Sequence, residues 1–212
     1  PLFSQQLTIN GTSKTIHITG DDIMLNNEAN NFVSAVKITT SGSDVELADV
    51  GDIILGASTV SGYYKVTAGG TVTQSGVLDI GGVTTIDAGS NAVTLTEALN
   101  DFTGAVSVIG DAVQLVDANA IDLGTTTTTG TYQVTATAGG DITDSGTLTI
   151  GGAATFTAAG GQNIYLDNLD SSNVLFGIHT FSGTVSFSSG GTLANVTVRD
   201  SDAFDFGAAL TL

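Results

Sequence analysis

The sequence predicts an all-β fold, a right-handed parallel β-helix in which short strands stack from one coil to the next. Two observations carry this prediction. Segments of similar sequence recur along the chain, and apolar residues recur at fixed places within each segment. We expect a single domain over residues 1–212, wound into about eight to nine coils, with three similar units at approximately 11–81, 82–151 and 152–212.

The amino-acid composition favours strands and turns over helices. Val, Ile, Thr, Ala and Leu dominate a chain of 212 residues that also holds 28 Gly and only 1 Pro. β-Branched residues favour extended backbone, and glycine suits tight turns. Because the charged helix formers Lys, Arg and Glu are scarce, we expect almost no α-helix.

Internal repeats are the strongest signal. AGGTVTQSGVLDIGG, which starts at Ala68, recurs as AGGDITDSGTLTIGG, which starts at Ala138. NNEANNF, from Asn26, recurs as TEALNDF, from Thr96, and VELADVGDIILG, from Val45, recurs as VQLVDANAIDLG, from Val113. Such repetition is typical of solenoids, whose stacked coils bury a continuous apolar column that one coil could not bury alone.

Glycines mark the starts of shorter coils inside the units. Gly82, Gly104, Gly130 and Gly152 start four successive coils of similar length. A coil of that length holds three short strands and three turns. Parallel strands joined by short turns need no helical crossovers, and the sequence contains no helical periodicity that would supply them.

Apolar residues form columns when the coils are aligned on these glycines. Strand side chains alternate between two faces, so residues two and four positions after each start share the inward face. The column at the fourth position consists of Ile38, Val66, Ile86, Val108, Val134, Phe156 and Phe187, and a second consists of Ile23, Val45, Val72, Val93, Val113, Ile142, Ile164 and Leu193. We expect Ile86, Val108 and Val134 to stack in adjacent coils. The polar residues between them should face water: Thr85, Ser107, Gln133, Thr155 and Ser186.

The charge of the chain excludes several classes of partner. It has 21 acidic residues against 4 Lys and Arg, a formal net charge of −17. A phosphate backbone or an anionic membrane surface would be repelled, so we expect no nucleic-acid partner. Self-repulsion between copies, which favours solubility, is the simplest role of the acidity.

Several other features bound the function by their absence. The chain has no Cys, which excludes disulfides, Cys-ligated zinc and a Cys nucleophile. No run of about 18 apolar residues is present, so we expect no membrane insertion. The start PLFSQQLTIN has neither Met nor the pattern of a signal peptide. Because the repeat is already running at Leu7, a fragment of a larger protein is expected.

The third unit departs from the repeat between Leu166 and Gly183, where a short stretch is inserted. We expect a loop that leaves the rod and exposes Phe176, His179 and Phe181, and this is the one place where local binding is plausible. A different alignment makes Phe181 the equivalent of Phe102, and hence a core residue. His17 lies far from His179 in sequence, so no pair of histidines for a metal is expected.

The lysines and threonines suggest two further alternatives. Lys37 and Lys65 fall at equivalent outward positions of neighbouring coils, where a pair could bind a sulfate or carboxylate of a glycan. Two solvated lysines are the simpler interpretation. The threonine run 125–129 resembles the threonine arrays of ice-binding solenoids, but a Thr-x-Thr motif on every coil is lacking.

The acidic residues do not define a catalytic or metal site. Asp49 and Asp117 could form a hydrolase pair, but they are repeat equivalents, which favours a scaffold role. Other aspartates cluster at turns, and the glycine-rich calcium-binding nonapeptide is absent: Asp21, Asp22, Asp52 and Asp122. With only one arginine, Arg199, the strong base of a polysaccharide lyase is not evident. We therefore assign no catalytic, cofactor-binding or metal-binding residue and expect no enzyme activity.

The segments AGGTVTQSGVLDIGGVTTIDAG and NDFTGAVSVIGDAVQLVDANAIDLG resemble the repeats of filamentous haemagglutinin-type exoproteins, over about residues 7–190. This resemblance implies a β-helix shaft, export by two-partner secretion, and a role in adhesion or contact-dependent competition. The secretion domain of that family, with its Asn-Pro motifs, does not occur here. The shaft repeats of the family define no ligand site, so no binding residue is carried over.

Together these observations predict a non-catalytic shaft or adhesion segment of a secreted or surface-exposed bacterial protein. The expected partners are a host-cell or glycan receptor and further repeats that continue the rod end to end. The alternative is a glycan-binding or glycan-cleaving β-helix, similar to polysaccharide lyases and hydrolases.

Overall fold

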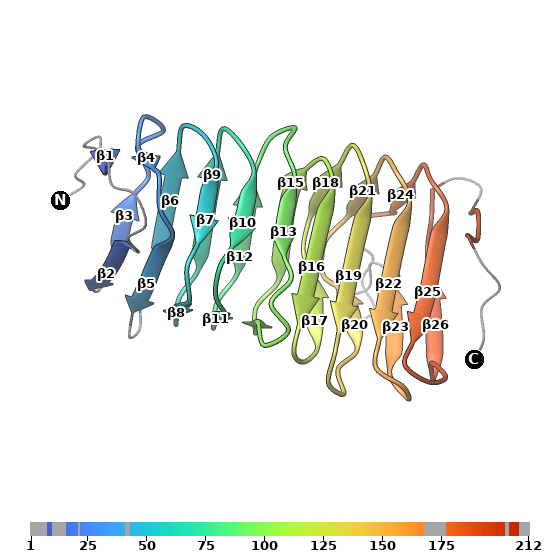
Figure 1. Ribbon diagram of the computed structural model, residues 1–212. Coiled ribbons are helices and arrows are strands. Elements are labelled where there is room, and N and C mark those ends of the chain that lie inside the picture. The colour runs from blue at the N-terminus through green and yellow to red at the C-terminus, as the bar shows by residue number, and fades with distance from the viewer. Residues whose placement is uncertain are drawn as a thin grey trace.

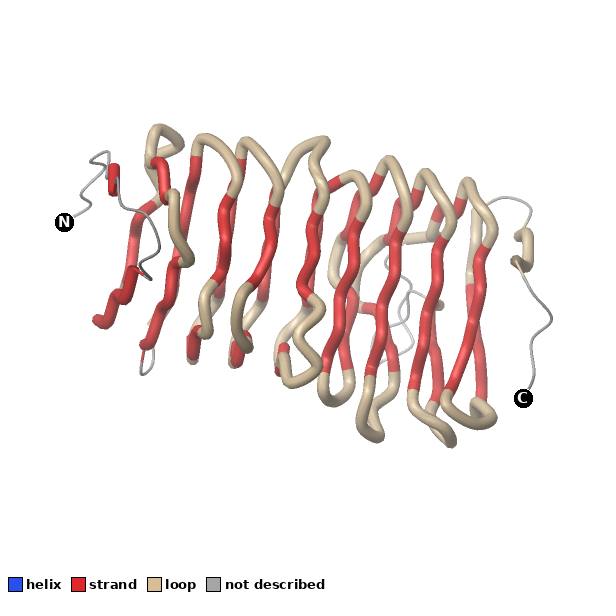
Figure 2. The backbone as a smooth tube through the Cα atoms, viewed as in Figure 1, coloured by secondary structure: helices blue, strands red, loops and turns tan. Residues whose placement is uncertain are grey.

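The computed structural model describes residues 8–9, 16–20, 22–40, 43–167, 177–201 and 204–207. In this part of the chain all regular structure is β-strand, and the strands wind into a parallel β-helix (Figure 1, Figure 2). Strands of the near sheet in Figure 1 run downward while the coils advance from left to right, which is a right-handed winding. The predicted fold class is confirmed, and the number of coils differs only slightly from the predicted eight to nine.

Two long parallel sheets form the opposite sides of the rod. The near sheet stacks β2 (Ile16–Gly20), β5 (Val36–Thr40), β7 (Ile53–Leu55), β10 (Val72–Gln74), β13 (Val93–Leu95), β16 (Val113–Asp117), β19 (Tyr132–Ala136), β22 (Ala154–Ala158) and β25 (Val185–Ser189). The far sheet stacks β3 (Ile23–Leu25), β6 (Val45–Asp49), β9 (Tyr64–Ala68), β12 (Thr84–Asp87), β15 (Val106–Gly110), β17 (Ile121–Leu123), β20 (Ile142–Asp144), β23 (Asn163–Leu166) and β26 (Asn195–Val198).

Shorter strands add a third side to some coils. β8 (Ser58–Val60), β11 (Leu78–Ile80) and β14 (Asp101–Phe102) extend the near sheet, whereas β18 (Thr126–Thr128), β21 (Leu148–Ile150) and β24 (Thr180–Phe181) extend the far sheet. β1 (Thr8–Ile9) pairs with β4 (Asn31–Phe32). Inward side chains of all sides form one apolar core that runs from Ile23 to Leu193.

Glycines let successive coils approach each other at the corners. A Cβ atom on Gly104 would lie 2.5 Å from the backbone oxygen of Gly82 in the preceding coil, and one on Gly183 would lie 2.4 Å from that of Gly152. Real side chains do not fit at such distances. The coil-start glycines of the sequence are therefore explained by backbone stacking, because any larger residue would push the coils apart.

Equivalent strands of successive units lie on opposite sheets. β5 is in the near sheet, but β15, its equivalent in the next unit, is in the far sheet. β6 and β16 show the reverse exchange. From β6 the chain makes three full turns to β15 and then half a turn to β16, so one unit spans three and a half turns.

The exchange of equivalent strands between the two sheets arises where one long strand pairs with two short strands of the next coil. In the near sheet Val36 of β5 pairs with Leu55 of β7, whereas Thr39 pairs with Thr59 of β8. In the far sheet β15 divides its pairing between β17 and β18 in the same manner. The chain bends between the two short strands, at Gly56 in the first case, and this bend moves the third side from one sheet to the other.

The sheet exchange corrects both predicted columns. Ile86 pairs with Val108, as predicted, but Val134 pairs with Leu115 and lies in the other sheet. Buried and exposed residues alternate in the same way in both sheets. The sequence pattern therefore continues without a break where the aligned residues pass from one sheet to the other. The same exchange separates Val45 in the far sheet from Val72 in the near sheet.

Candidate functional site

Buried carboxylates close a corner of the coil at the ends of β6 and β16. Asp49 Oδ2 accepts the backbone N–H of Phe32 at 2.5 Å, and its Oδ1 accepts that of Gly51 at 2.7 Å. Asp117 is equivalent: it accepts the N–H of Phe102 at 2.8 Å and that of Asn119 at 2.6 Å. Each carboxylate thus satisfies one donor of the preceding coil and one of its own turn, which is a scaffold role.

These two aspartates do not form a hydrolase pair. Asp49 ends a strand of the far sheet and Asp117 ends a strand of the near sheet, and both are buried. Burial raises the pKa of Asp117, while its two backbone hydrogen bonds act in the opposite direction. A third copy of the corner uses Asp200, whose Oδ1 accepts the N–H of Phe181 at 3.3 Å.

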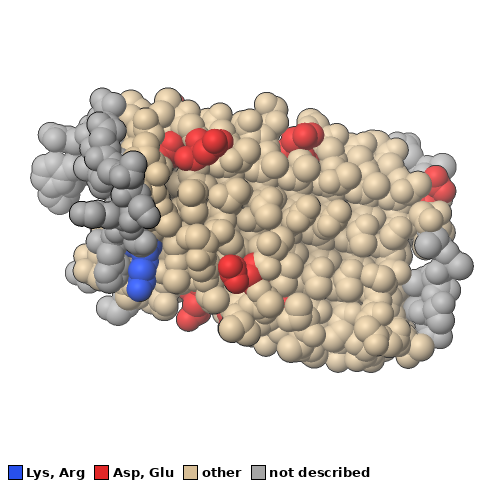
Figure 3. Space-filling model, viewed as in Figure 1, with Lys and Arg blue, Asp and Glu red and all other residues tan. Residues whose placement is uncertain are grey.

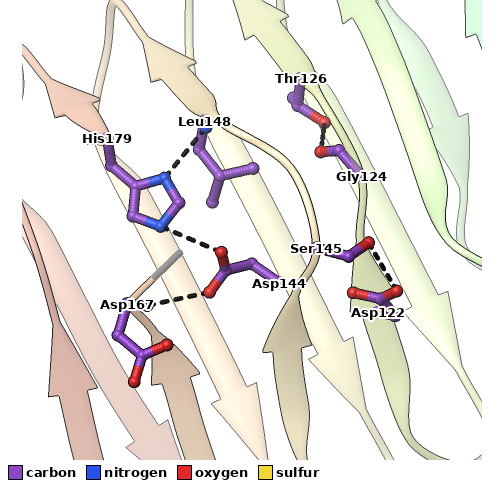
Figure 4. A network of polar contacts seen from close by, with 8 residues as sticks. All are labelled: Asp122, Gly124, Thr126, Asp144, Ser145, Leu148, Asp167 and His179. Atoms are coloured by element: carbon purple, nitrogen blue, oxygen red, sulfur yellow. Dashed lines mark hydrogen bonds and ion pairs between the residues drawn. The ribbon is translucent and has the colours of Figure 1, made fainter. Parts of the chain in front are cut away.

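His179 is a structural residue of the same corner, two positions before Phe181. Its side chain is completely buried, so the prediction that His179 and Phe181 are exposed was wrong, and Phe176 lies outside the described residues. His179 Nδ1 accepts the backbone N–H of Leu148 at 3.0 Å (Figure 4). The alternative alignment is confirmed: Phe181 pairs with Ile150 and is a core residue.

The equivalent residue one unit earlier is Asn100. Its Oδ1 accepts the backbone N–H of Leu78 at 2.9 Å, the same bond that His179 makes to Leu148, the repeat equivalent of Leu78. Asn100 also exchanges two hydrogen bonds with Gln74, at 2.8 and 3.0 Å. We call Gln74, Leu78, Asn100 and Asp117 the amide corner.

Asp144 replaces Gln74 in the later copy of this arrangement. Its Oδ2 lies 3.5 Å from His179 Nε2, and its Oδ1 accepts the backbone N–H of Asp167 at 2.9 Å (Figure 4). Because His179 Nδ1 accepts a hydrogen bond, the proton of the neutral ring is assigned to Nε2, which faces Asp144. We call Asp144, Leu148, His179 and Asp200 the histidine corner.

A buried histidine beside an aspartate has the composition of a general base, but this pair is enclosed. The exposed fractions of the two side chains are 0% and 1%. The nearby hydroxyl of Ser145 donates to Asp122 at 2.7 Å (Figure 4). A general base must come within hydrogen-bond reach of the substrate, and a pair buried in the wall of the rod lacks that access.

The expected placement of Lys37 and Lys65 at equivalent positions of neighbouring coils was wrong. Lys37 lies on β5 in the near sheet and Lys65 on β9 in the far sheet, so the two side chains are on opposite sides of the rod. The extra strand β8 separates their coils and explains the error. His17 pairs with Lys37 through the backbone, and its side chain lies outside the described residues. Figure 3 shows the near face, where charged side chains are sparse and mostly acidic.

The turn aspartates and the threonine run have local structural roles. Asp52 Oδ1 accepts both the backbone N–H and the hydroxyl of Thr71, at 2.7 and 2.9 Å, whereas Asp21 lies outside the described residues.

Thr126 and Thr128 point inward and are buried, so the threonine run is not a flat outward array. The hydroxyl of Thr126 donates to the carbonyl of Gly124 at 3.2 Å (Figure 4). Among the described residues, no group of three His, Cys, Asp or Glu side chains is arranged to hold a metal ion.

A polar hollow of about 140 Å³ lies on the outer face of β6 and β9. Glu46 and Lys65 are register neighbours there. Glu46 Oε2 accepts the side-chain N–H of Asn26 at 2.8 Å and its Oε1 accepts the hydroxyl of Tyr63 at 3.0 Å. The bond from Asn26 is the main cause that lowers the pKa of Glu46, and Lys65 contributes, while burial and Glu46 raise the pKa of Tyr63 to about 12.

Comparison with known proteins identifies a repeat family. A family model described as repeats of unknown function matches three successive segments, at residues 4–39, 42–109 and 110–188. No curated protein and no solved structure matches the chain. No helix in the described part of the chain is long and apolar enough to cross a membrane. The three matches cover most of the sequence, and the chain belongs to the family of repeats of unknown function DUF5649.

Proposed function

We propose that this chain is a non-catalytic shaft of a secreted or surface-exposed bacterial adhesin similar to filamentous haemagglutinin. The observation that carries the proposal is the continuity of the rod. Parallel ladders connect neighbouring coils in both sheets from β2 to β26, and one core runs through all three units. Such a rod is suited to hold a binding tip at a fixed distance from the cell.

The direction of the hydrogen bonds supports a mechanical role. In a parallel β-helix the bonds between strands of neighbouring coils run along the rod, so a pulling force is shared by a whole ladder. Between β22 and β25 alone, the register extends over five residue pairs, from Ala154 opposite Val185 to Ala158 opposite Ser189. Each coil adds about 4.8 Å of length, and one unit of three and a half turns adds about 17 Å.

The structure at the C-terminal end of the rod supports a continuation of the rod into further coils. Residues 204–207 already pair with β25. The N–H of Val185 donates to the carbonyl of Asp205 at 2.8 Å, and the carbonyl of Val185 accepts the N–H of Gly207 at 2.9 Å. Phe206 is 54% exposed there and offers an apolar surface on which a further coil would pack. Further repeats and a host-cell or glycan receptor are the partners of this shaft.

The test uses the complete protein in its own cells. Deletion of residues 82–151 removes one unit and shortens the reach of the shaft, whereas outward substitutions such as Thr85→Ser, Ser107→Thr and Thr155→Ser leave the length unchanged. We expect cell binding to fall in the deletion variant and to persist in the substituted one. Loss of binding in a folded, full-length substituted variant contradicts the shaft function.

The absence of catalysis is tested separately. We expect no product when the chain is incubated with pectins, alginates and sulfated glycans, with and without calcium. Reproducible depolymerisation favours the alternative of a glycan-cleaving β-helix and overturns the non-catalytic proposal.

A further inference from the structure

We propose that the hollow on the first unit binds one sugar ring of a neutral glycan. Its lining includes Asn26, Glu28, Glu46, Ala48, Lys65 and Thr67. The inference stands on the chemistry of this hollow and does not depend on the shaft function, because a rod serves as a spacer with or without a lateral binding site.

The hollow is formed by a turn that stands over the outer face of the far sheet. Asn26 and Glu28 belong to the segment between β3 and β4, and Glu46 and Ala48 point outward from β6. Although it points outward, Ala48 is only 2% exposed. Its short side chain lines the inner end of the hollow, next to Thr67, its register neighbour on β9.

The carboxylate of Glu46 is fixed in place before any ligand arrives. Asn26 and Tyr63 each donate a hydrogen bond to one of its two oxygens. A carboxylate oxygen accepts more than one hydrogen bond, so Glu46 keeps acceptor capacity toward the hollow. Preorganisation of this kind reduces the entropic cost of ligand binding.

The polar groups of the hollow fit a neutral hydroxyl-rich ligand. Glu28 and Glu46 are acceptors, Lys65 is a donor that makes no ion pair among the described residues, and Thr67 is both. An anion would meet two carboxylates, and a simple cation would meet the ammonium group. A sugar hydroxyl donates to a carboxylate and accepts from an ammonium at the same time, and such charge-assisted bonds are the stronger ones.

The second unit provides an internal comparison. The residues equivalent to Glu46 and Lys65 are Gln114 and Gln133, and Val116 stands in the place of Ala48. The second unit therefore carries neither the charges nor the small residue at this position. Because the chain folds with both sets of residues, exchanges between the two units are expected to leave the fold intact.

The experiment is a titration of the whole chain followed by amide NMR signals. The probes are glucose, galactose, mannose and N-acetylglucosamine, each added separately at constant ionic strength. We expect at least one sugar to shift the signals of residues 46–48 and 65–67. In Glu46→Gln, Lys65→Gln and Ala48→Val, each taken from the second unit, the affinity should fall at least about tenfold, or about 1.4 kcal/mol.

Asp79→Asn serves as the matched control, because Asp79 is an exposed outward carboxylate on β11, away from the hollow. This variant should bind the sugar as the parent chain does. The proposal is overturned if no sugar shifts these signals, if Ala48→Val binds as well as the parent, or if only acetate, sulfate or glycine binds at the hollow. These outcomes leave the length test of the shaft unaffected.

Discussion

The amide corner and the histidine corner hold the same fold with different chemistry. In the amide corner Gln74 and Asn100 exchange two neutral hydrogen bonds, at 2.8 and 3.0 Å. In the histidine corner Asp144 and His179 occupy the same places, with 3.5 Å between carboxylate and imidazole. Both corners present one acceptor to the backbone N–H of the neighbouring coil, at Leu78 or Leu148.

Comparison of the two corners shows that the fold requires a hydrogen-bond acceptor at this position. The backbone N–H groups of Leu78 and Leu148 are buried and need an acceptor, because an unsatisfied buried donor is costly. An amide oxygen and an unprotonated imidazole nitrogen both supply it. The amide does so at any pH, whereas the imidazole does so only while Nδ1 is free of a proton.

Removal of either acceptor should have the largest effect. Asn100→Ala and His179→Ala each leave a buried N–H without an acceptor and create a cavity, so each should lower the free energy of unfolding by about 2–4 kcal/mol. We expect Asn100→Ala to be the more damaging, because Asn100 also binds Gln74 and the carbonyl of Val116. Urea unfolding followed by circular dichroism measures both, and an equal or smaller loss in Asn100→Ala contradicts this ranking.

Transplantation of the amide corner should have a smaller effect. His179→Asn and Asp144→Gln should each destabilise the chain, because each single variant mismatches the pair. The double variant should recover part of the loss, with a coupling free energy of about 1 kcal/mol in a double-mutant cycle. Strict additivity of the two single changes would show that Asp144 and His179 do not act as a pair.

Replacement of the aspartates of the two corners should have the smallest effect on stability. Burial raises the pKa of Asp117 in the folded chain, so its contribution to stability is fully present below its unfolded pKa and declines as the pH rises through the folded pKa. Asp117→Asn should therefore cost more stability in acid than at neutral pH. The control is Asp200→Asn at the histidine corner, and a larger cost of Asp117→Asn at neutral pH than in acid refutes the assignment.

Much of the fold could be predicted because strand alternation and repetition are local properties of the sequence. The columns failed at Val134 because an inward residue of either sheet obeys the same alternation, and only the pairing of Val134 with Leu115 shows which sheet it joins. The separation of Lys37 from Lys65 has the same origin. One extra short strand moves the strands that follow it to the opposite sheet, while the alternation of inward and outward residues continues unchanged.

The histidine corner could have been found from the sequence, but only with the correct alignment. The insertion before His179 hides its equivalence with Asn100, although Phe102 and Phe181 stand two positions later in both copies. The hollow could not be predicted. It depends on Ala48 being smaller than Val116 beneath a turn that is distant in sequence, and that arrangement exists only in the folded chain.

Because each unit spans three and a half turns, successive units of a longer rod are rotated by half a turn about its axis. A feature that occurs once per unit on the outer surface would face one direction in one unit and the opposite direction in the next. Along a long array such features would form two antipodal rows, and neighbours within a row would be two units, or about 34 Å, apart. The two opposite sides of the rod would then carry the same residues. A single filament could therefore bind two surfaces at once, one on each side.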